Sequence, residues 1–345
     1  MSEMDLSMAA EQQLLVSVVV IGRNEGPRLL ACLDSIAGMS LDAHTIEVIY
    51  VDSDSTDGSP EMAAARGANV IRVKPERPSA ALGRNAGWRA ARGEFILFLD
   101  GDTQLNPEFV AHALAAFDAA DVAIVWGHRR ESNPEQSFYV RVLDLDWIYP
   151  PGDTEFCGGD ALVRRSVLDA VNGFDESLIA GEEPEMCRRI RADGGRIVHL
   201  DVPMTKHDLA ISRFSAYWRR AFRAGHAYAE VAARFRDSED PFWRRDVQRN
   251  WLHGGGLLLG SLCWFALLLQ ASPPSFAVAA LMSLAGFAVI ARSTLRNAWK
   301  SDNLTTRVLY ALHSHFQQIP ILCGQLSQRR DARRGRQRRL IEYKD

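Results

Sequence analysis

Residues 95–103 read FILFLDGDT, and this stretch decides the fold. Its first five residues are apolar, which predicts a strand buried on both faces, as the strands of parallel sheets are. The strand runs directly into Asp100 and Asp102, which flank Gly101. Ligands of open α/β sheets bind beyond the carboxyl ends of the strands, where two carboxylates can hold a divalent cation. Taken alone, the triplet is equally compatible with an acidic turn, because Asp and Gly both favour turns.

A second apolar run also ends in carboxylates. Residues 46–59 read IEVIYVDSDSTDGS, in which Asp52 and Asp54 directly follow the β-branched residues. An earlier run at 14–26, LLVSVVVIGRNEG, ends in a loop with charged residues. We therefore expect neighbouring strands to present charged side chains at one shared edge of a sheet.

Apolar runs and helical spacing alternate along the first part of the chain. Further strands are expected at 69–73 and 122–127, with helices before and after them. This alternation predicts an α/β fold with a mostly parallel sheet, right-handed crossovers and helices on both faces. The loop after the first strand lacks the GxGxxG fingerprint, which argues against a dinucleotide-binding dehydrogenase.

The later part of this region is less regular but contains further candidate ligands. Paired glycines ending at Gly159 suggest a backbone held close to a bound molecule. Residues 179–195 predict a helix whose first turn carries Glu182 and Glu183, and a late strand supplies His207. The glutamates could equally form a solvated helix start, where acidic residues favour the helix dipole, and the histidine could be an ordinary structural one.

Composition limits the class of protein. A chain of 345 residues with 47% apolar and 24% charged residues suits one sizeable catalytic-type domain plus an appendage, and excludes disorder for most of its length. Its five cysteines form no CxxC pair, which indicates a reduced compartment without a zinc or disulfide framework. A signal peptide is not expected, because the N-terminus has no basic segment and its first apolar run is too short. The net charge of -3 hides an arginine-rich end at 329–339, which suits an anionic membrane surface or nucleic acid.

The character of the chain changes near residue 211. Residues 213–235 predict a basic amphipathic helix lying on a membrane. Two uncharged apolar stretches follow, at 254–270 and 275–291, near the short end of the roughly 17 to 25 residues that span a bilayer. A buried helical hairpin of a soluble domain is the alternative. Each stretch is apolar all round, and Lys and Arg lie on the outer flanks but not in the turn, so we expect both to span, with the flanks and the catalytic domain in the cytoplasm.

These patterns divide the chain into consecutive parts. The expected parts are an N-terminal tail at 1–13, an α/β domain at 14–210, amphipathic interfacial helices at 211–250, a transmembrane hairpin at 251–292, and an amphipathic helix with a basic cytoplasmic tail at 293–345.

Five motifs, in their order along the chain, resemble family 2 of the glycosyltransferases. They are VSVVVIGRNEG at 16–26, VDSDSTDGS at 51–59, GRNAG at 83–87, FLDGDT at 98–103 and GEEPEMCRR at 181–189. Each is weak alone, but five in the right order and near the right spacing are specific. The resemblance covers residues 14–208 and implies inverting enzymes with the GT-A fold, a Rossmann-like sheet with helices on both faces.

The resemblance also implies roles for individual residues. Asp52 would contact the nucleotide base, Arg84 and Asn85 would form part of the nucleotide pocket, and Asp102 would bind the metal, with Asp100 near ribose and metal. The second acid of the pair Glu182 and Glu183 would be the catalytic base, although the family more often has aspartate there, so both stay candidates. The full set for nucleotide-sugar binding is Arg23, Glu25, Asp52, Asp54, Arg84, Asn85, Asp100, Gly159 and Arg189. The expected metal ligands are Asp100, Asp102 and His207, for Mg²⁺ or Mn²⁺.

Such a site is chemically reasonable for sugar transfer. A divalent cation can neutralise the charge that develops on a diphosphate leaving group. A carboxylate can remove the proton from the attacking hydroxyl, as carboxylates activate water in inverting glycosidases.

The sequence therefore predicts a metal-dependent inverting glycosyltransferase of the inner membrane, with its catalytic domain in the cytoplasm. It would move a single sugar from a nucleotide-sugar donor to a lipid-linked or envelope-glycan acceptor. The processive synthases of the family have a Gln-x-x-Arg-Trp signature, and the comparable helix here reads SAYWRRAF at 215–222, which disfavours a processive enzyme. The expected partners are the donor, the acceptor and anionic lipids of the membrane, without nucleic acid.

Two other classes of protein remain open. A GT-A-like nucleotidyltransferase would be expected to carry a glycine-rich basic loop after the first strand, where this chain has Arg23, Asn24 and Glu25. A membrane-anchored binding or scaffold protein could keep the fold without turnover. The joint presence of Asp100, Asp102 and Glu183 makes that second class less favoured.

Overall fold

In the computed structural model, which describes residues 16–41, 46–74 and 76–336, the chain forms two compact units. The first comprises Met1–Ser132 and Tyr149–Asp208, and the second comprises Asn133–Ile148 and Leu209–Asp345. The segment Asn133–Ile148, which falls inside the predicted 14–210 domain, thus groups with the helices that follow it.

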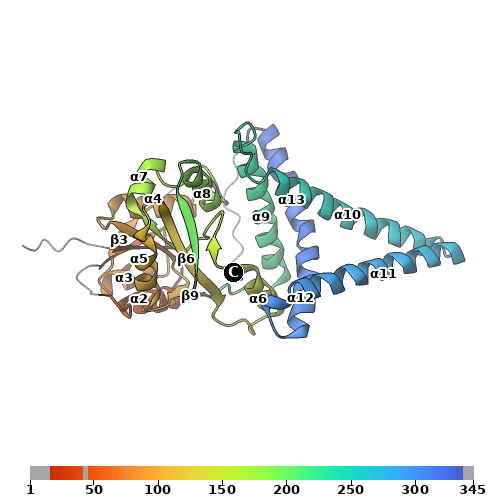
Figure 1. Cartoon of the computed structure of the whole chain (residues 1–345), viewed down its shortest axis with the longest axis horizontal. Coiled ribbons are helices and arrows are strands. Elements are labelled where there is room, and N and C mark those ends of the chain that lie inside the picture. Colours follow the sequence, from red (N-terminus) through yellow and green to blue (C-terminus); the bar gives the residue numbers. More distant parts are fainter. Residues whose placement is uncertain (1–15, 42–45, 75, 337–345) are drawn as a thin grey trace, which may run out of the picture. The chain divides into compact units, whose positions relative to one another are not determined.

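The first unit is built on a mixed sheet with helices around it (Figure 1). Its strands, in spatial order, are β3 (Asn69–Arg72), β2 (Ile46–Asp52), β1 (Val16–Gly22), β4 (Phe95–Asp100), β8 (Ala161–Arg164), β6 (Val122–Glu131), β9 (Arg196–His207) and β5 (Thr103–Leu105), with β7 (Gly152–Asp153) paired to β9. Its helices are α2 (Pro27–Ala37), α3 (Ser59–Ala65), α4 (Ala80–Ala90), α5 (Phe109–Ala115), α7 (Arg165–Val171) and α8 (Glu182–Ala192), together with the 3₁₀ turn η2 (Ala116–Asp118).

The strand β4 lies at the centre of this sheet, as its five apolar residues predict. All of Phe95–Leu99 are buried, and β4 pairs in parallel with β1 on one side. On the other side it pairs antiparallel with β8, which the sequence pattern did not predict. The predicted mostly parallel α/β fold is confirmed, because the first four strands in the order β3-β2-β1-β4 are all parallel.

Strand register sets the position of the acidic tips. Gly22 at the end of β1 pairs with Asp52 of β2, and Ile21 pairs with Asp100 of β4. The carboxyl ends of β2 and β4 therefore lie on either side of β1, at one edge of the sheet. The expectation of a shared acidic edge is met by this register.

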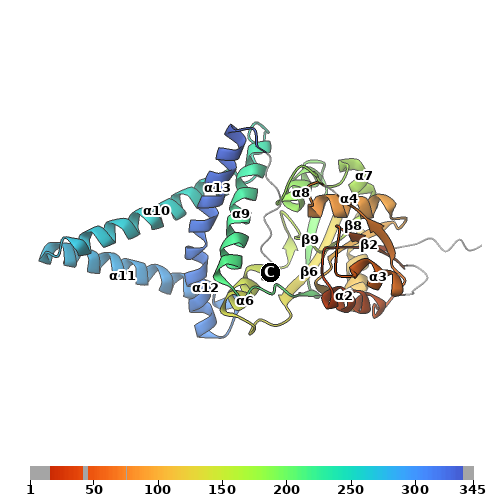
Figure 2. The same ribbon diagram turned by 180° about the vertical axis from the view of Figure 1, so that it is seen from behind.

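The second unit consists mainly of helices (Figure 2). They are α6 (Phe138–Asp144), α9 (Phe214–Arg234), α10 (Arg244–Leu269), α11 (Pro273–Arg296), α12 (Leu304–Phe316) and α13 (Gln318–Arg333), with the 3₁₀ turns η3 (Leu145–Trp147) and η4 (Ala298–Lys300). One amphipathic helix is expected within 293–345, whereas the structure has two, α12 and α13, which are divided at Gln317.

Two glycines let α9 and α13 cross with their backbones in contact. A Cβ atom on Gly225 would collide with the carbonyl of Ile321, and one on Gly324 would collide with the carbonyl of Phe222. The buried face of α9 includes Tyr217 and Ala221, whereas Phe214 is 49% exposed. The helix predicted at 213–235 thus exists, and part of its apolar face packs inside the second unit.

A buried polar network ties Asn133–Ile148 to the helices. Asp146 accepts a hydrogen bond from Tyr310 (3.1 Å) and lies 3.2 Å from His313 Nε2, while Tyr217 lies 2.7 Å from His313 Nδ1. Lys300 donates to the carbonyl of Leu145 (2.7 Å). Burial opposes the negative charge of Asp146, but the neighbouring cations outweigh it and lower its pKa. These contacts explain why this segment groups with the second unit.

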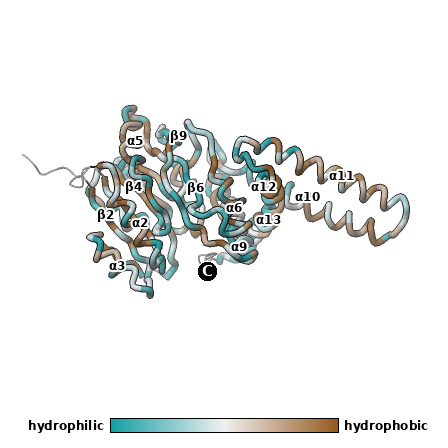
Figure 3. The backbone as a smooth tube through the Cα atoms, turned by 90° about the horizontal axis from the view of Figure 1, so that it is seen from below, coloured by the Kyte–Doolittle hydropathy of each residue, from teal (hydrophilic) through white to brown (hydrophobic). Residues whose placement is uncertain are grey.

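The helices α10 and α11 are long and apolar enough to cross a membrane, by length and composition. Hydrophobic residues lie along both helices (Figure 3). Their most apolar 18-residue windows are only 6% and 11% buried, and Leu269 and Phe287 are 85% and 73% exposed. The alternative of a hairpin buried in a soluble core does not fit this exposure.

Candidate active site

The candidate metal ligands come together through the pairing of β5 with β9. The chain turns after Asp100, and Thr103 of β5 then pairs antiparallel with His207, the last residue of β9. This register places Asp102 beside the histidine, with 3.3 Å between Asp102 Oδ1 and His207 Nε2. One ligand atom from each of Asp100, Asp102 and His207 lies within 4.8 Å of the others. The structure thus brings two neighbouring aspartates together with a histidine that lies far along the sequence.

This donor set fits a divalent cation. Two carboxylates supply the hard oxygen ligands that Mg²⁺ and Mn²⁺ take, and the imidazole supplies a third donor. Asp102 and His207 are buried, whereas the side chain of Asp100 is 31% exposed, which leaves access from solvent. The two carboxylates also give the group negative charge, and Arg84 forms an ion pair with one of them, Asp100.

Arg84, on α4, connects Asp100 to Glu182 of α8. Its guanidinium contacts Asp100 Oδ1 and Glu182 Oε1, both at 2.9 Å, and it is buried. Burial opposes its charge, but the two carboxylates outweigh this effect and raise the pKa of Arg84. A Cβ atom on Gly159 would lie 2.8 Å from Arg84 Nη2 and 3.0 Å from Asp100 Oδ2, so a larger residue there would displace this ion pair.

Asp160 is a further site residue that the sequence analysis missed. It is completely buried, and one carboxylate oxygen accepts a hydrogen bond from the backbone N–H of Asp100 (3.0 Å). The other accepts from Thr205 (3.0 Å) and lies 3.2 Å from Arg129 Nη2. Burial raises the pKa of Asp160 despite the nearby arginine. The only sequence signal was an acid directly after the paired glycines at 158–159.

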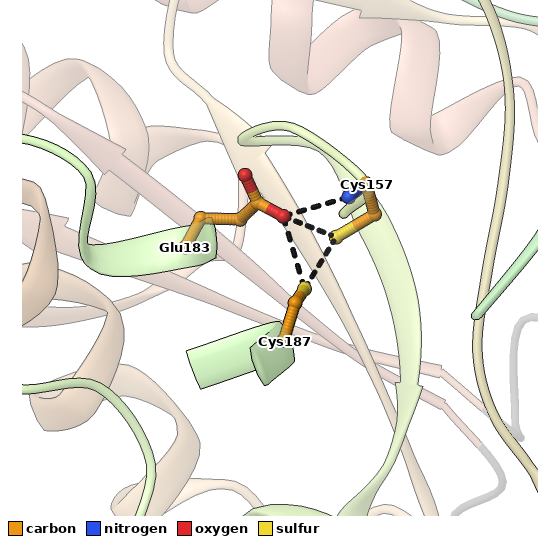
Figure 4. A group of neighbouring side chains, drawn as sticks. All are labelled: Cys157, Glu183 and Cys187. Atoms are coloured by element: carbon orange, nitrogen blue, oxygen red, sulfur yellow. Dashed lines mark hydrogen bonds between the residues drawn. The ribbon is translucent and has the colours of Figure 1, made fainter. Parts of the chain in front are cut away.

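Glu183 is held by two thiols and a backbone amide (Figure 4). Its Oε1 atom accepts from the N–H of Cys157 (2.7 Å), from Cys157 Sγ (3.3 Å) and from Cys187 Sγ (3.0 Å). The two sulfur atoms are 3.8 Å apart, and both cysteines are free thiols. The second oxygen of Glu183 points away from the sulfurs (Figure 4).

The surroundings of Glu183 set its protonation. Burial raises the pKa of Glu183 above its ordinary value of 4.5, and the hydrogen bonds from the thiols oppose this only in part. Burial also raises the pKa of Cys157 to about 11, so this thiol stays protonated and can donate. The sequence contained one clue to this arrangement, because Cys187 follows Glu183 by four residues on the same helix face.

The candidates after β1 and β2 lie at the same edge of the sheet. Asp52 is buried and accepts from Tyr50 (3.1 Å) and from the N–H of Ser55 (2.9 Å). Asp54 is in the left-handed region (φ 62) and lies 3.5 Å from Lys74.

The loop after β1 approaches the tip of β4. Glu25 forms an ion pair with Arg28 (2.9 Å), and its Cγ atom would lie 3.2 Å from a Cβ on Gly101. Arg23 is exposed in the same loop. The loop and the tip of β4 therefore adjoin.

Asn85 and Arg189, in contrast, hold a turn of the protein itself. The amide of Asn85 donates to the carbonyl of Phe174 (2.8 Å) and accepts from its N–H (3.0 Å). Arg189 pairs with Glu185 (2.8 Å) and donates to the carbonyl of Gly173 (2.7 Å). Both side chains thus stabilise the 173–174 turn, and a contact of either with a nucleotide stays a prediction.

Comparison with known protein families decides which family this fold belongs to. The profile described as Glycosyl transferase family 2 matches residues 17–171, and the one described as Glycosyl transferase family group 2 matches residues 95–291, more than half of the chain. The chain belongs to glycosyltransferase family 2. The predicted family and enzyme class are therefore confirmed.

Curated relatives agree with this assignment. This family 2 chain is 35% identical over 246 residues to the putative glycosyltransferase EpsH of Bacillus subtilis, covering 64% of this chain and 68% of the relative. It is 26% identical over 239 residues to the pre-mycofactocin glycosyltransferase of Mycobacterium tuberculosis, covering 66% and 49%. It is 24% identical over 224 residues to the beta-monoglucosyldiacylglycerol synthase of a Nostoc species, covering 60% and 47%. The chain thus spans about half the length of the last two relatives.

Solved structures share the fold of this family member. The mannosyltransferase PcManGT of Pyrobaculum calidifontis, in complex with GDP-Man and Mn²⁺, matches with a TM-score of 0.61 at 22% identity, over 87% of this chain and 86% of that one. Residues 1–349 of TarS from S. aureus, in complex with UDP-GlcNAc, match with a TM-score of 0.50 at 16% identity, over 93% and 92%. At these identities the likeness concerns the fold, which is GT-A-like.

Proposed function

We propose that this protein is a membrane-bound, metal-dependent inverting glycosyltransferase that moves a single sugar from a nucleotide-sugar to a lipid-linked or envelope-glycan acceptor. The observation that carries the proposal is the edge site. There Asp100, Asp102 and His207 can share one cation beside the Arg84–Glu182 ion pair and the buried Glu183.

Asp102 and His207 would hold the cation from the buried side, and Asp100 would complete its protein ligands from the exposed side. Such an ion, Mg²⁺ or Mn²⁺, neutralises the negative charge that a diphosphate leaving group gains when the bond to the sugar breaks. Arg84 keeps the carboxylate of Asp100 oriented, and Asp160 fixes the backbone of the same residue by its hydrogen bond. The donor would occupy the edge formed by Asp52, Asp100 and the loop after β1.

Glu183 is the better candidate for the general base. Glu182 is engaged by Arg84, whereas Glu183 has only hydrogen-bond donors on Oε1 and a second oxygen directed away from them. A carboxylate with a raised pKa is better matched to removing a proton from a hydroxyl near neutral pH. In this role Glu183 would take the proton of the acceptor hydroxyl while that oxygen attacks the sugar.

The donor class is carried over from neighbours in the fold. PcManGT is described with GDP-Man and Mn²⁺, and TarS with UDP-GlcNAc. We propose a nucleotide-sugar donor of the same class for this chain, bound at the edge of the sheet where the cation ligands lie.

Membrane association is supported by the second unit. Arg244, Arg245 and Arg249 precede the apolar part of α10, and Arg292 and Arg296 follow that of α11, while the turn at 270–272 has no basic residue. This distribution suits two spans with both flanks on the cytoplasmic side of the inner membrane. A lipid acceptor agrees with the name of one relative, a diacylglycerol-derivative synthase.

A ligand screen tests the proposal directly. Purified full-length protein would be heated with UDP, GDP, dTDP and their sugars, with and without Mn²⁺, because a ligand that binds only the native state raises the unfolding temperature. We expect one nucleotide series to stabilise the protein only with the metal, and the matching sugar to be transferred to lipid extracted from membranes. Equal stabilisation with and without metal would refute the metal assignment. Recovery of the protein in the soluble fraction without detergent would refute membrane binding.

A further inference from the structure

A hollow of about 430 Å³ lies on the second unit, between α10 and α13. We call it the arginine cavity. Its lining combines guanidinium groups with two apolar side chains, namely Arg329, Arg330, Arg333, Arg334, Trp251 and Leu326. Nothing in the proposed transfer reaction uses it.

The crossing of the two helices forms this cavity. A Cβ atom on Gly254 of α10 would lie 2.5 Å from the carbonyl of Gln318 and 3.0 Å from Leu322 Cβ, so the helices touch there. Trp251 lies one turn earlier on α10 and contacts Arg329, which is later on α13, so the helices run antiparallel. Beyond the point of contact the long side chains of both helices surround the hollow.

The cavity concentrates positive charge without a matching acid. Among the described residues, none of its four arginines forms an ion pair with a carboxylate, and Arg329 stacks on the ring of Trp251 at 4.4 Å. The neighbouring acid on α13, Asp331, lies 3.9 Å from His226 Nε2 on α9. Guanidinium groups that line the same cavity repel one another, so an anion bound between them is favourable. Their planar forks suit phosphate oxygens in particular.

The position of the cavity along α10 indicates which kind of molecule would carry the phosphate. Trp251 precedes the apolar part of the helix, and the next residue, Leu252, is 79% exposed. A tryptophan at the start of an apolar helix is typical of the level of lipid headgroups. The indole and Leu326 add apolar contacts that a free ion would not use.

We infer that the arginine cavity binds an anionic membrane lipid whose headgroup is a phosphate monoester, with its four guanidinium groups on the phosphate and its apolar residues against the adjoining chain. The inference rests on the membrane association proposed above. It adds a specific lipid site to that association, separate from the nucleotide-sugar site.

The test measures lipid binding to the purified full-length chain in a neutral detergent by native mass spectrometry. The probes are dihexanoyl phosphatidic acid, dihexanoyl phosphatidylcholine and inorganic phosphate. The cavity variant is Arg330→Gln with Arg333→Gln. The matched control is Arg292→Gln with Arg296→Gln, which removes the same number of positive charges from the last turns of α11. Binding of the nucleotide that the ligand screen identifies is measured on the same samples.

We expect the unmodified chain to bind phosphatidic acid and to prefer it to phosphatidylcholine. The cavity variant should lose about 30-fold in affinity, because each basic residue near an anionic lipid contributes about fivefold. The control should lose less than about twofold, and nucleotide binding should not change in either. The single variant Arg333→Gln should lose about fivefold, and it keeps the test decisive if the double variant folds poorly.

Three results would overturn the inference. Equal weakening in the cavity and control variants would show a general charge effect. Equal binding of the two lipids would remove the role of the phosphate monoester, and inorganic phosphate binding as tightly as the lipid would assign the cavity to a free anion. Each of these can occur while nucleotide binding persists, so failure of this inference is distinct from failure of the proposed transferase.

Discussion

The two units of the chain place their charged residues in opposite ways. In the first unit, carboxylates gather at the ends of strands, where register brings Asp102 to His207, and Arg84 of α4 reaches Glu182 of α8; each pair is about 100 residues apart in sequence. In the second unit, polar contacts such as Asp146–His313 lie between helices, and two further helices expose apolar side chains. The edge of a sheet concentrates functional groups because neighbouring parallel strands end there, whereas helices place such groups wherever two helix surfaces cross.

This contrast predicts different consequences of mutation. Substitutions at the strand edge should remove chemistry or ligand binding and leave the fold intact. Substitutions at helix crossings of the second unit should reduce stability and leave the edge site intact. The following predictions test the contrast, beginning with the largest expected effect.

Glu183→Gln should lower the rate of sugar transfer by about 100-fold to 10,000-fold, as loss of a general base does. The amide keeps the size of the side chain, so the dissociation constant of the donor should stay nearly unchanged. Single-turnover transfer and donor titration measure the two quantities separately. Glu182→Gln is the matched comparison, since it breaks the ion pair with Arg84 instead. If Glu182→Gln shows the loss of rate and Glu183→Gln stays active, the two roles must be exchanged.

Asp102→Asn should weaken metal-dependent donor binding by about 100-fold, because even residues that only support metal ligands cost 10-fold to 100-fold. Titration of the Mn²⁺-dependent nucleotide affinity measures the effect. Asp121→Asn is the control, because its side chain is 51% exposed, lies 3.7 Å from Arg196 and belongs to none of the candidate site groups. Equal losses in both variants would contradict the metal assignment.

Gly324→Ala should destabilise the second unit by about 1 to 3 kcal/mol, the usual cost of overpacking. The added Cβ collides with the backbone of Phe222, so the two helices must move apart. Thermal unfolding monitored by circular dichroism measures the loss. Gly286→Ala on α11 is the control, because nothing lies within 4 Å of its added Cβ. Donor binding should persist in both variants, and its disappearance in Gly324→Ala alone would show that the units are not independent in the way proposed.

Cys187→Ala should shift the acidic limb of the pH–rate profile to higher pH by about half to one unit, the equivalent of one hydrogen bond. The thiol donates to Glu183 and thereby lowers the pKa of that carboxyl, which burial has already raised above 4.5. Its loss raises the pKa further, and a base must be deprotonated to act. The profile of kcat/KM against pH measures the shift. A shift in the opposite direction would contradict the role of this thiol.

The same raised pKa has a consequence for stability. Because the folded protein binds this proton more tightly than the unfolded chain, the contribution of Glu183 is fully present below pH 4.5 and is lost as the pH rises through its folded pKa. Removal of the carboxyl in Glu183→Gln should therefore stabilise the protein slightly at neutral pH. Thermal unfolding of that variant at two pH values measures the effect, and destabilisation at neutral pH would contradict it.

The family, the α/β fold and the acidic strand tips followed from the sequence, because apolar periodicity and motif order are local properties of the chain. FILFLDGDT contains both its strand and the two carboxylates that end it, and the apolar stretches of α10 and α11 are continuous in sequence. Only the tertiary structure decided which distant groups meet. Asp160 reaches the backbone of Asp100 through the antiparallel pairing of β8 with β4, and Cys157 reaches Glu183 across 26 residues. The arginine cavity likewise depends on a helix crossing at Gly254. Strand register and helix contact are set by packing between segments far apart in the chain, and no pattern within a single segment contains them.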